Sequence, residues 1–225
     1  VNTDGPTSQA GTADANEQQA QLEQVAFIGD VFAPFFLQDP LTGTAGPSFA
    51  AMAALDPAAA AAEWPFVDAE AAEGPLALMA QGAADAAENL AREYRRLFVG
   101  PAHKAAPPWG SVYTDRECVV FGASTLELRR WMRESGIVRS SEERTPEDHI
   151  GLMLSLMAYV ALSRPDSLDE YLQKHLLTWS SHFLDELAEA ARHPFYQGLA
   201  QLAKASLEGI GAQRGIAVTH PRFYR

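Results

Sequence analysis

Apolar residues that recur every three or four positions, between signals that start and stop helices, constrain the fold of this chain more than any other feature. The strongest example begins at Thr145 and Pro146, a favourable N-cap and first helical residue, and continues to about residue 162. It is apolar nearly all round, so we expect this helix to cross the middle of the core. No stretch shows convincing alternation with a period of two, the pattern of a half-buried strand. The sequence therefore predicts an all-α fold.

Helices are also predicted throughout the first half of the chain. A pattern of helical spacing starts at Glu17 and continues to about Phe36, and Pro34 should kink or end that helix. Five prolines over residues 38–75 predict short helices separated by breaks. A longer helix is expected over residues 76–98, where apolar residues again fall on one side.

In the second half, residues 100–113 differ from their surroundings, because three prolines and two glycines deny regular structure to this segment. We expect a long loop, and long ordered loops in compact domains often carry function. Ser124 and Glu127 form a capping box that predicts the start of a helix. Further helices are predicted over residues 167–187 and about 195–207.

These patterns predict a single globular domain of about ten helices over residues 16–225, preceded by a disordered tail at residues 1–15. A chain of 225 residues is long enough to bury a core of its own. The tail has neither the basic region nor the apolar region of a secretory signal.

The charge balance of the chain is acidic. Its 29 Asp and Glu residues outnumber its 17 Lys and Arg residues, which gives a formal net charge of −12. A phosphate backbone is repelled by such a field, so we expect no nucleic-acid partner, whereas a basic peptide is attracted. The single cysteine, Cys118, excludes an internal disulfide and fits a reducing compartment. Since no apolar run approaches the roughly 20 residues of a membrane-spanning helix, the simplest location is the cytoplasm.

The sequence carries no local signature of catalysis or of a cofactor. It has neither a Walker-type phosphate loop nor a Gly-x-Gly-x-x-Gly motif. Its six histidines form no pattern of zinc ligands. His175 and His182 can share a helix face, but without a third ligand we expect them to be polar-face or boundary residues. We therefore expect no enzyme, no cofactor and no metal site.

Several stretches, in their order and spacing, carry a resemblance to a known family. The three most specific are residues 93–101 (EYRRLFVGP), 107–113 (PPWGSVY) and 146–149 (PEDH). The similarity continues through residues 120–125 (VFGAST), 128–134 (LRRWMRE) and 193–196 (HPFY). In this set the chain closely resembles the twin-arginine leader-binding chaperones of the TorD/DmsD family, the DmsD branch in particular, over about residues 93–224.

The resemblance implies an all-helical chaperone without catalytic activity. Such chaperones bind the twin-arginine signal peptide of a molybdoenzyme catalytic subunit of the dimethyl sulfoxide reductase type. They hold back export until cofactor insertion is complete. A contact with the export machinery at the membrane, and either a monomer or a domain-swapped dimer, are further expectations.

The resemblance also implies which residues bind the peptide. Matched by position, the leader-binding surface consists of Tyr94, Leu97, Phe98, Pro107, Pro108, Trp109, Arg116, Asp148 and His149. The family often has Trp where Tyr94 stands, so an aromatic residue is kept at that position.

Elementary chemistry gives these residues two competing roles. A signal peptide offers an arginine pair followed by an apolar segment, so its receptor needs a carboxylate beside an apolar, aromatic groove. Asp148 and His149, expected in the first turn of a helix with outward side chains, can supply part of this beside Trp109. On composition alone, however, Asp148 is an ordinary charge at a helix start, and such aromatics usually pack in the core. The resemblance favours binding for these three residues and leaves Leu97 and Phe98 open between the two roles.

Two alternative functions remain beside signal-peptide binding. The first is a chaperone that acts mainly on the folded reductase body or on cofactor insertion. The second, from another class, is a helical nucleotide-binding protein or enzyme, although no nucleotide site is visible in the sequence. The sequence does not say which reductase is the client.

Overall fold

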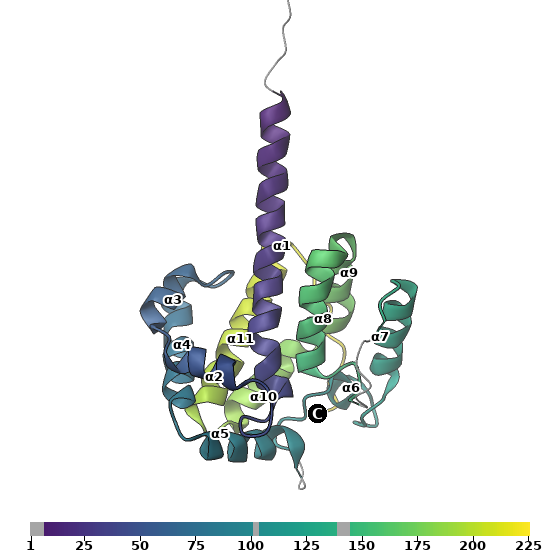
Figure 1. Ribbon diagram of the computed structural model, residues 1–225. Helices are drawn as coiled ribbons and strands as arrows, with labels where there is room; N and C mark the ends of the chain where they lie inside the picture. The colour runs from purple at the N-terminus through teal and green to yellow at the C-terminus, as the bar shows by residue number, and fades with distance from the viewer. Residues whose placement is uncertain (1–6, 101–103, 139–144) are drawn as a thin grey trace, which may run out of the picture.

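The computed structural model describes residues 7–100, 104–138 and 145–225, with the side chains of the first helix described from residue 15 on (Figure 1). The described residues form eleven α-helices: α1 Thr7–Leu37, α2 Gly46–Ala53, α3 Pro57–Glu63, α4 Ala69–Ala83, α5 Ala87–Tyr94, α6 Gly110–Thr114, α7 Ala123–Glu134, α8 Ile150–Ser163, α9 Leu168–Tyr171, α10 Ser180–Ala190 and α11 Pro194–Gln213. Short π-helical or 3₁₀ segments are η1 Arg95–Val99, η2 Pro165–Ser167 and η3 Leu172–Leu176. In this part of the chain there is no strand, only an isolated bridge between Trp109 and His149. The predicted all-α fold is confirmed.

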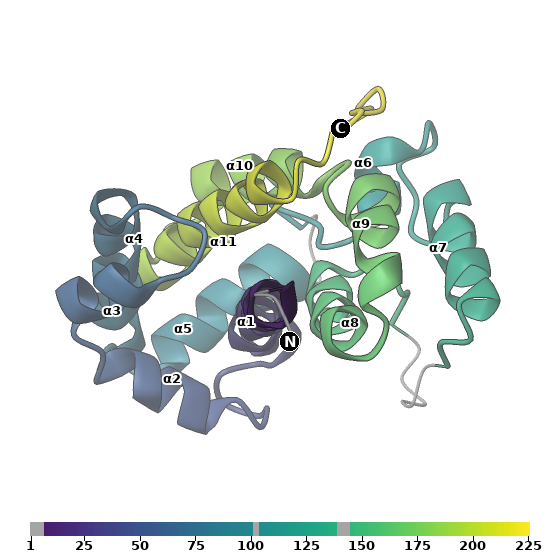
Figure 2. The same cartoon turned by 90° about the horizontal axis from the view of Figure 1, so that it is seen from above.

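Helix α1 is the centre of the bundle. It packs along α8 on one side and against α11 on another (Figure 2). Phe32 and Phe36 of α1 are fully buried. The ring of Phe36 lies 5.8 Å from that of Phe98, and Phe35 lies 5.0 Å from Phe195 of α11. Aromatic contacts around α1 therefore join the N-terminal and C-terminal halves of the chain.

Pro34, expected to kink or end the first helix, lies inside α1 and does not end it. The helix continues through Leu37, and the amide of Gln38 still donates to the carbonyl of Pro34, 2.9 Å away. Proline removes one helical hydrogen bond. The burial of Phe35 and Phe36 directly after it favours the continued helix.

The helix predicted over residues 76–98 is divided between α4, α5 and η1. The break follows Ala83, and α5 starts at Ala87. Asp85 stabilises the break, since its carboxylate accepts from the amide of Ala86 at 2.7 Å and from the side chain of Asn89. A short acidic side chain that bonds its neighbouring backbone offers an alternative to the helical hydrogen bonds.

The helix predicted over residues 167–187 is also divided, into α9, η3 and α10. Ser167 is the N-cap residue of α9, although its side chain makes no capping hydrogen bond. The Thr178 hydroxyl donates to the carbonyl of His175 at 3.1 Å, and the Trp179 backbone leaves the helical region before α10 begins. The last helix is longer than the predicted range 195–207 because Ile210 remains fully buried.

The N-terminal boundary of the domain remains a prediction. Helix α1 begins at Thr7, ahead of the start expected at Glu17. The tail predicted at residues 1–15 falls partly outside the described residues, as do the side chains of residues 7–14.

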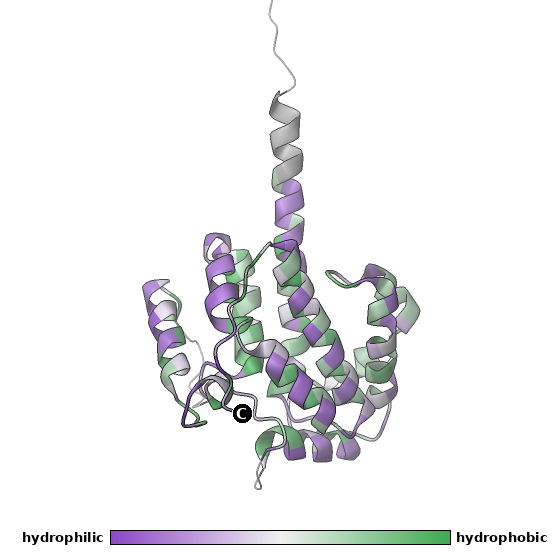
Figure 3. Cartoon of the chain, turned by 180° about the vertical axis from the view of Figure 1, so that it is seen from behind, coloured by the Kyte–Doolittle hydropathy of each residue, from purple (hydrophilic) through white to green (hydrophobic). Residues whose placement is uncertain are grey.

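The surfaces of the helices are mixed, with hydrophilic and hydrophobic residues alternating along them, as expected for helices with one buried face (Figure 3). Among the described residues, none of the helices combines the length and the hydrophobicity that crossing a membrane requires.

Candidate functional site

The start of α8 is built differently from the prediction. Residues 146–149 form a turn, and the helix begins at Ile150 with His149 as its N-cap, not at Thr145 and Pro146. The Nδ1 atom of His149 accepts a hydrogen bond from the amide of Gly151 at 3.1 Å. Burial lowers the pKa of His149 to about 3, so its ring is neutral and can accept this bond.

The loop before α6 is bound to this turn. The amide of Ile150 donates to the carbonyl of Pro108 at 2.8 Å, and the amide of Gly110 donates to the carbonyl of Asp148 at 3.1 Å. The rings of Trp109 and His149 meet edge to face, with centroids 5.6 Å apart. Residues 110–114 are helical, so the predicted loop ends earlier than residue 113. Pro108, Trp109, Asp148 and His149 therefore lie together; that they bind a peptide stays a prediction.

Asp148 is the buried charge of this region. The sequence predicts that its side chain points outward from a helix, but this is wrong, because only 3% of the residue is exposed. The amide of Ser111 in α6 donates to its Oδ2 atom at 2.8 Å. Its Oδ1 atom is buried and has no hydrogen-bond partner among the described residues. A buried carboxylate oxygen without a partner is costly, and a cationic ligand would satisfy it.

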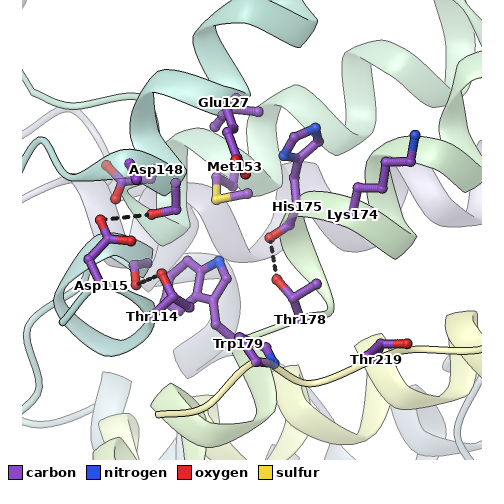
Figure 4. Close-up of a pocket in the computed structure, with 15 residues that line it drawn as sticks. Thr114, Asp115, Glu127, Asp148, Met153, Lys174, His175, Thr178, Trp179 and Thr219 are labelled. Carbon is purple, nitrogen blue, oxygen red and sulfur yellow. Dashed lines mark hydrogen bonds between the residues drawn. The ribbon is translucent and has the colours of Figure 1, made fainter. Parts of the chain in front are cut away.

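Asp148 lines a pocket of about 370 Å³, which we call the acidic pocket (Figure 4). It lies between α6, α7, α8, η3 and the C-terminal segment. Its walls are formed by Gly110, Thr114, Asp115, Ala123, Ser124, Glu127, Leu128, Asp148, Met153, Lys174, His175, Thr178, Trp179, Thr219 and Pro221. Gly110 is required here, since a Cβ atom at this position would lie 2.8 Å from the ring of Trp179.

The charges that line the acidic pocket are mainly negative. Asp115, Glu127 and Asp148 contribute three carboxyl groups. Lys174 is the one basic residue of the wall, and its ammonium group pairs with Glu170 at 2.6 Å. In Figure 4 its side chain extends away from the two aspartates.

The titrating groups of the acidic pocket also favour a cation. Burial lowers the pKa of His175 to about 4, so this histidine adds no positive charge at neutral pH. Burial raises the pKa of Asp115, and the nearby Asp148 carboxylate raises it further. A cation that binds between two carboxylates reduces the electrostatic repulsion between them.

Asp115 also holds the start of α7. The capping box predicted for Ser124 and Glu127 is not formed, because the N-cap residue is Gly122 and no side chain caps the helix from that position. Instead, the amides of Ala123 and Ser124 donate to the Asp115 carboxylate. A Cβ atom on Gly122 would clash with that carboxylate, so this position requires glycine. A long-range acceptor therefore replaces the local cap.

Comparison with known proteins connects this site to a family. Residues 57–190, more than half of the chain, match the family model described as nitrate reductase delta subunit. The chain is 46% identical over 165 residues to the Tat proofreading chaperone DmsD of Salmonella paratyphi A, which covers 73% of this chain and 79% of that protein. The chain belongs to the TorD/DmsD family of chaperones.

Two further members of the TorD/DmsD family match a smaller share of the chain. The probable Tat proofreading chaperone DmsD of Haemophilus influenzae is 45% identical over 138 residues, 61% of this chain and 68% of that protein. The chaperone protein TorD of Shewanella piezotolerans is 28% identical over 125 residues, 52% of this chain and 58% of that protein. The resemblance inferred from the motifs is confirmed. Because the family consists of chaperones, the prediction that the chain is not an enzyme is confirmed as well.

Three residues assigned to the binding surface by the family motif lie in the core. Leu97 is fully buried and Phe98 is 3% exposed. The Tyr94 hydroxyl donates to the carbonyl of Phe36 at 3.2 Å, and burial raises its pKa to about 12. None of the three lines the acidic pocket.

The arginines of the same family motif support this core. Arg95 pairs with Asp39 at 2.7 Å. Arg96 donates to Glu93 at 2.7 Å and to the carbonyl of Ala190 at 2.6 Å. Segment 93–98 therefore attaches η1 to the ends of α1 and α10.

The remaining assigned residues differ in how much of their surface is exposed. Pro107 and Pro108 are buried, Trp109 is half-buried, and Arg116 is exposed. Arg116 lines a second hollow that shares Thr114, Asp115 and Ala123 with the acidic pocket.

Sequence reasoning missed most of the acidic pocket. Three separate segments contribute Asp115, Glu127 and the adjacent pair Thr178 and Trp179, and no local pattern connects them. His175 lines the pocket, whereas His182 stacks on Phe223 with ring centroids 4.1 Å apart. Among the described residues, no group of three or more His, Cys, Asp or Glu side chains is placed to hold a metal ion.

Proposed function

We propose that this chain binds the twin-arginine signal peptide of a molybdoenzyme catalytic subunit, of the dimethyl sulfoxide reductase type, and assists its maturation before export. The observation that carries the proposal is the buried Asp148 carboxylate, whose Oδ1 atom has no partner among the described residues and which lines the acidic pocket. The names of the DmsD relatives, Tat proofreading chaperones, support the same function.

The proposed contact is between a guanidinium group of the leader and the carboxylates of the acidic pocket. Arginine presents a planar fork of donors that matches a carboxylate, and such charged hydrogen bonds are the strong ones. Asp148 supplies the carboxylate that pairs with the guanidinium, while Asp115 and Glu127 supply further negative charge. The Trp179 ring lines the same pocket.

Burial makes this contact selective. A carboxylate removed from water is compensated by an ion that pairs with it, and a neutral side chain leaves it uncompensated. A leader with glutamines in place of its arginines fills the same space without supplying that charge. The acidic net charge of −12 also steers a basic peptide toward the chain.

The proposal includes the cytoplasm as the place of action, since a signal peptide is held there before export. A contact with the export machinery, and either a monomer or a domain-swapped dimer, stay predictions.

The test begins by identifying the client. The chain is used to recover its partner from the native cytoplasm, and a synthetic peptide of that partner's leader is titrated by calorimetry. The proposal requires binding of this peptide and at least about tenfold weaker binding when both arginines are replaced by glutamine. Equal binding of the two peptides contradicts it. Binding of a precursor that persists after its leader is deleted would favour the alternative, a chaperone for the reductase body or for cofactor insertion.

A further inference from the structure

The loop between α6 and α7 exposes consecutive apolar side chains. Val119 is 45% exposed, Val120 38% and Phe121 49%. Tyr224, from the C-terminal segment, is 42% exposed. We call these four residues the apolar rim. An exposed apolar cluster of this kind on a folded chain commonly marks an interaction surface.

The loop that carries the rim is firmly held. The amide of Cys118 donates to the carbonyl of Asp115 at 3.0 Å, and Asp115 also binds the start of α7. The guanidinium of Arg129 lies 5.2 Å from the ring of Phe121 and pairs with Glu147 at 2.6 Å. These hydrogen bonds and the contacts of Arg129 thus hold the loop in a conformation that exposes its apolar side chains.

The backbone of the loop adds a second sign of function. Cys118 and Phe121 adopt positive φ angles of 49° and 70°. Residues other than glycine rarely occupy this region, and such strain tends to gather at functional sites.

The rim borders the acidic pocket. A hollow of about 320 Å³ lies between Val119 and Tyr224. It shares Thr114, Asp115 and Ala123 with the acidic pocket. Arg116 and Glu117 also line this hollow, whereas Val120 and Phe121 do not. One continuous surface therefore passes from the acidic pocket through this hollow to the apolar rim, with Asp115 at the junction.

We propose that the apolar rim binds the apolar segment of the signal peptide while the acidic pocket holds the arginine pair. This inference rests on the proposed function. The order of chemistry along the surface, acidic and then apolar, is complementary to a leader in which arginines are followed by apolar residues. The rim covers the apolar segment, while the neighbouring carboxylates of the acidic pocket hold the arginines that precede it.

The test combines two forms of the chain with two peptides. The rim variant is Val119→Ser with Val120→Ser. Its matched control is Val138→Ser with Leu162→Ser, which changes two aliphatic residues that are 88% and 54% exposed, one in the segment after α7 and one in the last turn of α8. The two peptides are the intact leader and a leader whose apolar segment is replaced by serines. Light scattering reports the mass of each form of the chain.

We expect the rim variant to bind the intact leader about tenfold more weakly than the parent, and the control variant to bind it like the parent. The serine-substituted leader has no apolar segment to contact the rim, so the rim variant and the parent should bind it with the same affinity. Should the rim variant fold poorly, Tyr224→Ser on the opposite wall replaces it in the same comparison.

Two outcomes overturn the inference. Equal weakening of both peptides by the rim variant means that the rim does not contact the apolar segment. A change of mass with unchanged leader affinity means that the rim is an interface between copies of this chain. In both cases the parent still binds the intact leader, so the proposed function stands. Failure of the parent to bind the intact leader would instead remove the proposed function.

Discussion

Segment 93–98 and the region around Asp148 belong to the same family resemblance, yet their buried polar groups are satisfied differently. In segment 93–98 the Tyr94 hydroxyl donates to a backbone carbonyl, and Arg96 is paired with Glu93. Around Asp148 the Oδ1 atom of the carboxylate is buried without a partner among the described residues, and the residue lines a pocket. The Tyr196 hydroxyl beside Phe98 is also buried without a partner, but an unpaired carboxylate oxygen costs more than an unpaired neutral hydroxyl and therefore gains more from a cationic ligand. This difference indicates which of the two regions contacts a peptide.

The largest expected effect is a loss of stability when segment 93–98 is changed. Leu97→Ala removes a fully buried side chain, so the free energy of unfolding should fall by about 2–5 kcal/mol. The folded fraction should bind the leader with the affinity of the parent. Urea unfolding and calorimetry measure the two quantities.

Val99→Ala is the matched control for this prediction. Val99 lies in the same segment and is 53% exposed, so we expect a change of less than about 0.5 kcal/mol. If Leu97→Ala lowers leader affinity tenfold and leaves stability unchanged, segment 93–98 contacts the peptide and is not only part of the core.

Asp148→Asn should produce the largest effect on binding. Asparagine keeps an acceptor for the amide of Ser111 and removes only the charge. Leader affinity should fall by about 1.5–3 kcal/mol, roughly tenfold to over a hundredfold, with little change in the melting temperature. Alanine is a poorer probe, because it also leaves the buried Ser111 amide without its acceptor.

Asp166→Asn makes the same change of net charge at an exposed position in η2 and should bind the leader like the parent. Should both asparagine variants lose affinity equally, net charge and not the buried carboxylate governs binding.

His149→Asn tests whether His149 stabilises the turn before α8 or contacts the leader directly. Burial lowers the pKa of His149 from 6.5 to about 3, so between these values the unfolded chain binds a proton that the folded chain does not. The free energy of unfolding therefore falls as the pH drops, by about 1.4 kcal/mol per pH unit from this residue.

Asparagine is a good N-cap that does not titrate, so the slope between about pH 6 and pH 4 should become shallower by that amount in the variant. Urea unfolding at several pH values measures it, with leader affinity at pH 7 nearly unchanged. His175, whose pKa is also lowered, continues to contribute in both proteins. Identical slopes would show that His149 is not held neutral.

Salt should have the smallest effect. Raising NaCl from 0.1 M to 1 M shortens the Debye length from about 10 Å to about 3 Å, which weakens attraction between exposed charges. Burial of the apolar segment does not fade in this way. Leader affinity of the parent should fall roughly threefold, mostly through slower association.

The leader with glutamines in place of its arginines should lose most of this salt sensitivity, and stopped-flow measurement of the two peptides checks it. Equal salt dependence of both would indicate that the arginines are not recognised by charge.

The helices around the core could be predicted because their signals are local. The apolar pattern over residues 150–162 predicts a buried helix, and α8 is one. Its start could not be predicted from Thr145 and Pro146, since residues 148 and 150 instead pair with the loop at residues 108–110. That pairing joins segments about forty residues apart, and no local propensity describes it.

The sequence by itself determined the all-α fold, the acidic charge and the family, since spacing, composition and ordered motifs are properties of the chain alone. Only the tertiary structure decided that Leu97 and Phe98 fill the core and that Asp148 lines a pocket. It also brought Asp115, Glu127 and Trp179 to that pocket from three separate segments. The physical reason is that burial and hydrogen-bond satisfaction depend on which distant segments pack together, so the same residue types can be core in one place and ligand-facing in another.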